Sequence, residues 1–147
     1  MKISLEKFDF RKNSKLVAIW HEDHVKINFP DSKYKKSIFI NSLKRKPKNE
    51  MSMVKVGDEY VGFLWLKRER DIFKELYFCN LKYIHVIPEY RSKGVGSYLM
   101  KEVDKYSKRN GCCEIRLGTS VSNKRAINLY KKCGFVIKRV LMEKKLC

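Results

Sequence analysis

The hydrophobic pattern in the first half of the chain changes from a helical to a strand period. Near the N-terminus, apolar residues recur every three or four positions on both sides of Pro30, which predicts two helices with a break between them. Further along, apolar and polar residues alternate in runs separated by turn residues, which predicts a hairpin. The helices are predicted at residues 12–26 and around Tyr34, Ile38, Phe39 and Leu43. The strands are predicted at residues 3–5, 51–56, 60–66 and between 76 and 87, with a polar loop at 44–50 and either an exposed strand continuation or a loop at 67–71.

In the second half of the chain, amphipathic helices and short apolar strands follow one another. Gly111 comes directly after a helical run that ends in basic residues, which indicates a left-handed residue closing that helix. The predicted elements are a helix at 95–109, a strand at 112–119, a helix capped by Ser122 or Asn123 that ends at Gly134, and closing strands at 135–137 and 141–142. The 147 residues, 44% of them hydrophobic, suffice to bury a core, and we expect one α/β domain over residues 1–147.

The stretch from Tyr83 to Met100 carries the main chemical signal. An alternating strand ends at Pro88, and Gly94 and Gly96 then lead directly into a helix. Glycines let the backbone approach a ligand closely, and the unpaired N–H groups at a helix start attract anions. The loop therefore fits a phosphate or pyrophosphate, although a glycine-softened turn without a ligand has the same pattern. The Walker pattern GxxxxGK[ST] and the dinucleotide fingerprint GxGxxG are both excluded, the latter because Leu99 stands where its last glycine would fall.

The net charge indicates which classes of partner the protein binds, and the cysteine content indicates the redox state of its compartment. The formal net charge of +18 favours acidic partners such as nucleic acid, a ribosomal surface or an anionic substrate, although the lysines are spread along the whole chain. Five cysteines without CxxC spacing are typical of reduced thiols in a cytoplasmic protein. His21 and His24 lack further ligands at metal-binding spacing, so no metal is expected. No apolar run is long enough for a membrane span, and no signal peptide is indicated.

Two linked motifs identify the second half of the chain as similar to a known family. Residues 86–96 (VIPEYRSKGVG) match V-x-P-x-[YF]-[RQ]-x-x-G-x-[GA], and residues 123–135 (NKRAINLYKKCGF) match N-x-x-A-x-x-[LF]-Y-x-x-x-G-F. The chain therefore resembles the GNAT superfamily of acyl-CoA-dependent N-acyltransferases, over about residues 81–142. The resemblance implies a GNAT-like α/β fold with a mixed central sheet of about six to seven strands and about four flanking helices. Residues 1–80 would form its acceptor-side half, and residues 81–142 its acetyl-CoA-binding core.

The resemblance also implies roles for individual residues. The strand before the loop would pair with the pantetheine arm of acetyl-CoA, and an N–H near Val86 would bind the thioester oxygen. The pyrophosphate would lie on the loop N–H groups, with Arg91 or Lys93 adding charge. Tyr130 matches the family's general acid, which protonates the departing sulfur or donates a hydrogen bond to it; the alternative is an ordinary core aromatic. The cofactor-binding residues implied are Ile84, His85, Val86, Arg91, Ser92, Lys93, Gly94, Val95, Gly96, Ser97 and Asn123.

The function implied is transfer of an acetyl group from acetyl-CoA to a primary amine by direct attack on the thioester. The acceptor, a small-molecule or peptide amine, is not readable from the sequence, nor is the choice between monomer and homodimer. Glu75 and His85 are the nearest groups that titrate usefully as a general base. A water chain or an acceptor that is already deprotonated would make a base unnecessary. The alternative from another class is a basic module that binds nucleic acid or the ribosome and keeps the fold without catalysis.

Overall fold

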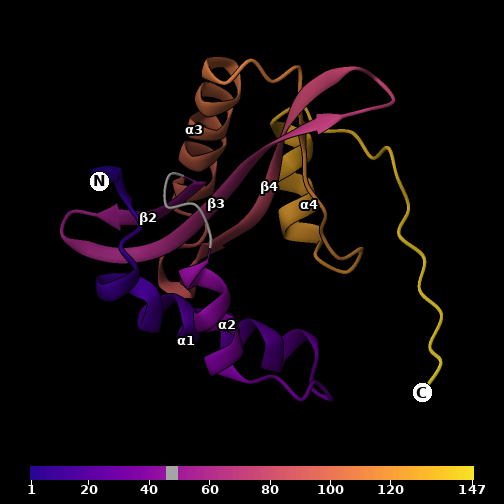
Figure 1. Cartoon of the computed structure of the whole chain (residues 1–147). Coiled ribbons are helices and arrows are strands. Elements are labelled where there is room, and N and C mark those ends of the chain that lie inside the picture. Colours follow the sequence, from indigo (N-terminus) through magenta and orange to yellow (C-terminus); the bar gives the residue numbers. More distant parts are fainter. Residues whose placement is uncertain (46–49) are drawn as a thin grey trace.

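The computed structural model describes residues 1–45 and 50–147 and shows one sheet with helices on both faces (Figure 1). Its elements are β1 (Ile3–Lys7), α1 (Phe10–Asn28), α2 (Lys36–Lys44), β2 (Met51–Val56), β3 (Glu59–Asp71), β4 (Leu76–Val86), the 3-10 helix η2 (Pro88–Tyr90), α3 (Val95–Arg109), β5 (Glu114–Arg116) and α4 (Lys124–Lys132). The predicted α/β class and the four predicted helices are thereby confirmed. The predicted loop at 44–50 includes residues 46–49, which lie outside the described residues.

The sheet leaves one side of β4 without a neighbouring strand at the end that leads to α3. The five strands lie in the order β1-β2-β3-β4-β5, with β1 to β4 antiparallel. β5 runs parallel to β4 and pairs only with Phe78, Cys79 and Asn80. Residues 81–86 of β4, apart from Lys82, therefore pair with β3 on one side, and no described strand covers their other side. Backbone groups on such an edge are available to a ligand.

A bulge in the β3–β4 pair decides which side chains of β4 face which layer. Trp65 pairs with Tyr83 and Leu66 pairs with Leu81, so Lys82 is an extra residue in the ladder. One extra residue turns every following side chain to the opposite face. As a result, Ile84 packs on the α3 side with Leu81, whereas Tyr83 packs on the α1 side.

Two hydrophobic clusters hold the layers together, one on each face of the sheet. Figure 1 shows α3 on one side of the sheet and α1 and α2 on the other. The buried residues on the α3 side are Val54, Val61, Leu64, Leu66, Cys79, Leu81, Val95, Leu99, Met100, Val103 and Tyr130. Those on the α1 side are Phe8, Val17, Trp20, Leu43, Met51, Met53 and Phe63. Among the described residues, no helix combines the length and the apolar character that crossing a membrane requires.

Several predicted element boundaries change in the structure. α1 begins earlier than predicted, because the Asp9 side chain accepts a hydrogen bond from the Lys12 N–H at 3.0 Å and caps the helix. Tyr34 precedes α2 instead of lying within it. Residues 67–71, left open between strand and loop, belong to β3, which is 13 residues long. β5 has only three residues, fewer than predicted, because it pairs with only three residues of β4.

The predicted closing strands at 135–137 and 141–142 are wrong, and the sheet consequently has five strands instead of six or seven. The Phe135 N–H donates to the Tyr130 carbonyl, and beyond Phe135 no backbone hydrogen bond joins the tail to the described residues. A strand requires such a partner, and the tail runs away from the sheet instead (Figure 1). Six large apolar side chains of this tail are 67–87% exposed: Val136, Ile137, Val140, Leu141, Met142 and Leu146.

Candidate active site

The loop that joins β4 to α3 presents backbone N–H groups next to the open edge of β4. Ser92 and Gly94 both adopt the left-handed conformation, with φ of 59° and 85°. Such residues bring successive N–H groups to one concave side of a turn, which is a common anion-binding arrangement. Gly94 is also the N-cap of α3, and no described side chain caps that helix. The N–H groups of its first turn therefore remain available, and the positive end of the helix dipole adds to the attraction for an anion.

Three basic side chains surround this loop. The Arg91 Nε donates a hydrogen bond to the Val86 carbonyl at 2.8 Å, which ties the loop to the end of β4. The Lys93 Nζ lies 5.5 Å from the centre of the Tyr90 ring. The Arg125 guanidinium, from the first turn of α4, donates to the Ser92 hydroxyl. Arg125 was not predicted as a site residue, because no spacing rule relates it to a loop 33 residues earlier.

Glycines allow two close approaches around the site. A Cβ on Gly96 would lie 2.9 Å from Leu129 Cδ2, so the start of α3 packs directly against α4. A Cβ on Gly62 would lie 2.2 Å from the His85 carbonyl oxygen, and that backbone atom cannot move aside. Gly62 was not predicted as important, although an isolated glycine inside an alternating strand is a recognised sign of close backbone approach.

The second motif places α4 beside the loop. The Asn123 side chain accepts a hydrogen bond from the Ala126 N–H at 3.3 Å and thereby caps α4, so of the two predicted caps Asn123 is the correct one. Tyr130, about two turns further on, is buried in the cluster on the α3 side, where Ile84 and Val86 also pack. Its hydroxyl has no hydrogen-bond partner among the described residues, and burial raises its pKa. The structure thus brings the α3 loop, the start of α4 and Tyr130 to the same side of β4.

The opposite face of β4 carries a cluster of aromatic rings and histidines. The His85 ring stacks on Trp20, with ring centres 5.3 Å apart, and the Tyr83 ring lies 5.7 Å from that of His21 on α1. The Tyr83 Oη and the His85 Nε2 are buried and have no hydrogen-bond partner in the described part of the chain. Burial, reinforced by the nearby Arg91 charge, lowers the pKa of His85 to about 4, so this ring is neutral near pH 7.

Of the two groups considered as a general base, only His85 lies near the loop. Glu75 belongs to the turn before β4 and pairs with Arg70 at 2.7 Å. The ten residues of strand from Glu75 to His85 span about 30 Å at strand rise. Glu75 is therefore removed as a candidate base, because it stands at the far end of the hairpin. The side chain of His85 faces α1, so only its backbone lies on the open edge with Ile84 and Val86.

The described residues, 1–45 and 50–147, contain no group of three metal-ligating side chains. The two histidines of α1 have other partners. The His21 Nδ1 is 2.9 Å from the Tyr34 hydroxyl, and the His24 Nδ1 is 3.2 Å from the Asn28 side-chain amide.

Comparison with known proteins agrees with this architecture. The model of the acetyltransferase (GNAT) family matches residues 14–135, which is most of the chain, and the chain therefore belongs to this family. The solved structure of AAC(6')-Iy in complex with a CoA-containing bisubstrate analogue superposes with a TM-score of 0.73 at 17% identity, over the whole of both chains. At that identity the likeness concerns the fold, and it agrees with the expected GNAT-like fold.

Curated relatives match more locally. Thialysine N-epsilon-acetyltransferase from Mus musculus is 41% identical over 54 residues, which is 37% of this chain and 32% of the relative. N-alpha-acetyltransferase 30 from Xenopus laevis is 35% identical over 83 residues, which is 55% of this chain and 29% of the relative. The matched segment thus spans only about a third of each of these relatives. Both are named as acetyltransferases that act on nitrogen.

Proposed function

We propose that this protein transfers an acetyl group from acetyl-CoA to the nitrogen of a primary amine. The observation that carries the proposal is the juxtaposition of three features at the open edge of β4: unpaired strand backbone, an uncapped α3 N-terminus behind the left-handed residues Ser92 and Gly94, and a buried tyrosine, Tyr130. The family membership and the N-acetylating relatives support the same reaction.

The cofactor would lie along residues 84–97 and the start of α4. Its pyrophosphate would accept hydrogen bonds from the N–H groups of residues 92–97, and Arg91, Lys93 and Arg125 would balance its charge. The uncovered backbone of Ile84, His85 and Val86 would bind its extended arm, with Asn123 at the second motif. When bound, acetyl-CoA supplies an activated acetyl group on a thiol leaving group.

The residues of the chain would assist the transfer in two ways. A backbone N–H between Ile84 and Val86 would donate a hydrogen bond to the acetyl oxygen as negative charge develops there, a contribution of roughly 3 kcal/mol per donor. Tyr130 would donate a hydrogen bond to the departing sulfur. Because burial raises its pKa, the phenol keeps its proton over the working pH range and remains a donor. We assign residues 1–80 to the acceptor side and residues 81–142 to the cofactor side.

Proton removal from the amine does not need a strong protein base in this arrangement. His85 is the only histidine of β4, and its low pKa of about 4 makes it a weak base. An acceptor that arrives deprotonated, or a water chain, fits this site better than proton transfer to His85.

Nucleic-acid binding has only the net charge of +18 in its favour, and no described structural feature adds to it.

Thermal unfolding measured with increasing acetyl-CoA, and with free CoA and ATP as controls, tests the proposed cofactor site. Ligand at about 100 times its Kd adds about 2.7 kcal/mol to the stability of a protein that binds it only when folded. For a domain of this size, that stabilisation corresponds to a rise in Tm of roughly 5–10 °C. A rise of this order with acetyl-CoA, and much less with ATP, supports the proposal; no rise at millimolar acetyl-CoA would overturn it.

A further inference from the structure

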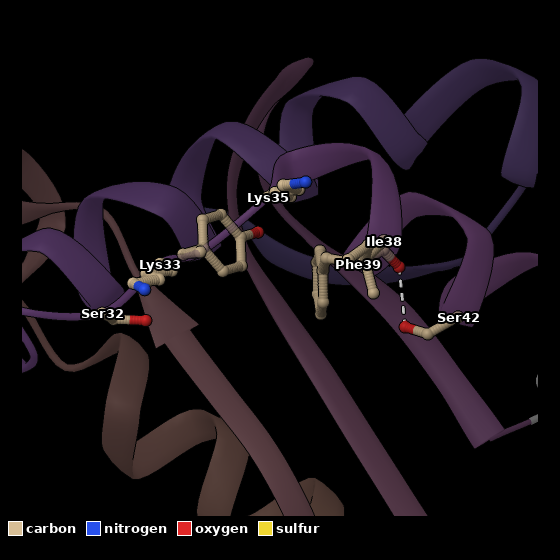
Figure 2. A pocket seen from close by; sticks show the side chains of 7 residues that line it. Ser32, Lys33, Lys35, Ile38, Phe39 and Ser42 are labelled. Atoms are coloured by element: carbon tan, nitrogen blue, oxygen red, sulfur yellow. Dashed lines mark hydrogen bonds between the residues drawn. The ribbon is translucent and has the colours of Figure 1, made fainter. Parts of the chain in front are cut away.

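An open hollow lies on the α1 side of the molecule, where the chain turns from α1 into α2. Its volume is about 420 Å³, which is enough for a small metabolite. Figure 2 shows the side chains around it, with the Ser42 hydroxyl donating a hydrogen bond to the Phe39 carbonyl. The residues that line the hollow are Ser32, Lys33, Tyr34, Lys35, Ile38, Phe39 and Ser42.

The inner wall of this hollow leads to β4. The Tyr34 hydroxyl is 2.9 Å from His21 Nδ1, and the Phe39 ring stacks on the His21 ring with centres 3.8 Å apart. His21 in turn lies beside Tyr83 of β4, whose hydroxyl is buried and has no hydrogen-bond partner among the described residues. The rings of Tyr34 and Phe39, with the His21 ring behind them, thus lie between the hollow and Tyr83 of the strand that would hold the acetyl group.

The chemistry of the hollow is cationic at its rim and apolar in its wall. Lys33 and Lys35 both line it, and neither ammonium group has an ion pair or hydrogen bond with a described residue. Ile38 is an apolar residue 65% exposed on this wall. The lining contains no carboxylate, and Glu22 of α1, whose charge acts on Tyr34, is paired with Lys26 at 3.5 Å. A polyamine or another polycation would therefore meet cationic but no anionic side chains in this lining.

We propose that this hollow binds the acceptor, and that the acceptor is a small amino carboxylate: an apolar molecule with a primary amine at one end and a carboxylate at the other. Lys33 and Lys35 bind the carboxylate at the rim, Ile38 and Phe39 contact the apolar body, and the amine points past Tyr34 and His21 toward β4. This inference rests on the proposed acetyl transfer and adds the class of acceptor to it.

A matched pair of amines tests the inference, because the two differ only in the group that the lysines would recognise. ε-Aminocaproic acid carries a carboxylate, and ε-aminocaproamide replaces it with a neutral amide. Two partly exposed charge contacts together account for a preference of about 10-fold for the acid, in binding and in the KM of acetylation. The double variant Lys33→Glu/Lys35→Glu is expected to lose this preference or reverse it, without a change in acetyl-CoA affinity.

The control is Lys101→Glu/Lys108→Glu, which changes the net charge equally but lies on exposed positions of α3, across the sheet. It should keep the preference for the acid. The affinity for each amine is measured by calorimetry alongside the acetylation rate. The preference for the acid can then be determined even if neither amine is acetylated. Equal binding of acid and amide to the unmodified protein, or a preference that survives in Lys33→Glu/Lys35→Glu, would overturn the inference alone. Failure of acetyl-CoA to bind would instead overturn the proposed function.

Discussion

The two ligand sites proposed on either face of the last residues of β4 are built by different means. On the α3 side, the features that suit a cofactor belong to the backbone: an uncovered strand edge, two left-handed residues and the start of a helix. On the α1 side, the proposed site consists of side chains, namely the rings of His21, Tyr34 and Tyr83 and two lysines that pair with no described residue. Backbone recognition requires particular residues at fixed spacings, whereas a wall of side chains can be built in many ways. The first kind of site therefore leaves a motif in the sequence, and the second does not.

The largest expected effect is loss of the cofactor from the backbone-built side. In Gly94→Trp, the indole occupies the space in front of the loop N–H groups, and the residue must also remain left-handed at φ 85°. We expect acetyl-CoA affinity to fall at least about 100-fold, while the backbone strain lowers stability by only about 1–2 kcal/mol. The stability is measured by urea unfolding and the affinity by calorimetry.

Gly57→Trp is the matched control for this change. Gly57 is also left-handed, at φ 59°, and an added Cβ meets nothing within 4 Å at either glycine, but Gly57 lies in the β2–β3 turn. It should show the same loss of stability with unchanged acetyl-CoA affinity. Full affinity in folded Gly94→Trp would show that the loop does not hold the cofactor.

Tyr130→Phe tests the one side chain assigned a catalytic role on the same side of the sheet. Removing a hydrogen bond to the leaving sulfur is expected to lower kcat roughly 100-fold, with the KM for acetyl-CoA unchanged within about 2-fold. The loss should be constant across the neutral pH range, because burial keeps the phenol protonated there. Tyr106→Phe, on α3, is the control, and steady-state kinetics is the measurement. Equal kcat in the two variants would leave Tyr130 as a core residue.

The sequence predicted the cofactor side of β4 better than the α1 side, and the reason is physical. Pro88, Gly94 and Gly96 are constrained by backbone geometry, so the strand, the loop and α3 were predicted close to their observed bounds. The contacts of His21 with Tyr34 and Tyr83 join segments that are 13 and 62 residues apart, and no local pattern encodes them. The closing strands were predicted from the β-propensity of residues 135–142, but propensity supplies no pairing partner. The bulge at Lys82 was also missed, because only the register of two strands defines it.

The α1 side of β4 can be tested through the pH dependence of stability, because the His85 side chain lies there. Its pKa is about 4 in the folded protein against a usual value of 6.5, so between these pH values the unfolded chain binds more protons. Stability from this group is therefore present above about pH 6.5 and is lost as the pH falls toward 4. Between about pH 7.5 and about pH 5 the loss is about 2 kcal/mol. His85→Phe, which keeps a ring against Trp20, should remove this part of the pH dependence in urea unfolding. An identical pH dependence in the variant would mean that His85 titrates normally.

The smallest expected effect comes from the segment that belongs to neither face. Val140, Leu141 and Met142 are 82–87% exposed, so deleting residues 140–147 removes almost no buried surface. The deletion keeps Phe135 in its cluster, and it keeps the contact of Arg139 with Asp71, which is 4.0 Å long. We expect the free energy of unfolding to change by less than about 0.5 kcal/mol, and acetyl-CoA affinity not at all. Urea unfolding and light scattering of both forms provide the check. The opposite outcome is a shortened chain that is more than about 2 kcal/mol less stable and is a monomer in solution where the full chain is a dimer. That outcome would show that these apolar side chains are covered by a second copy of the chain.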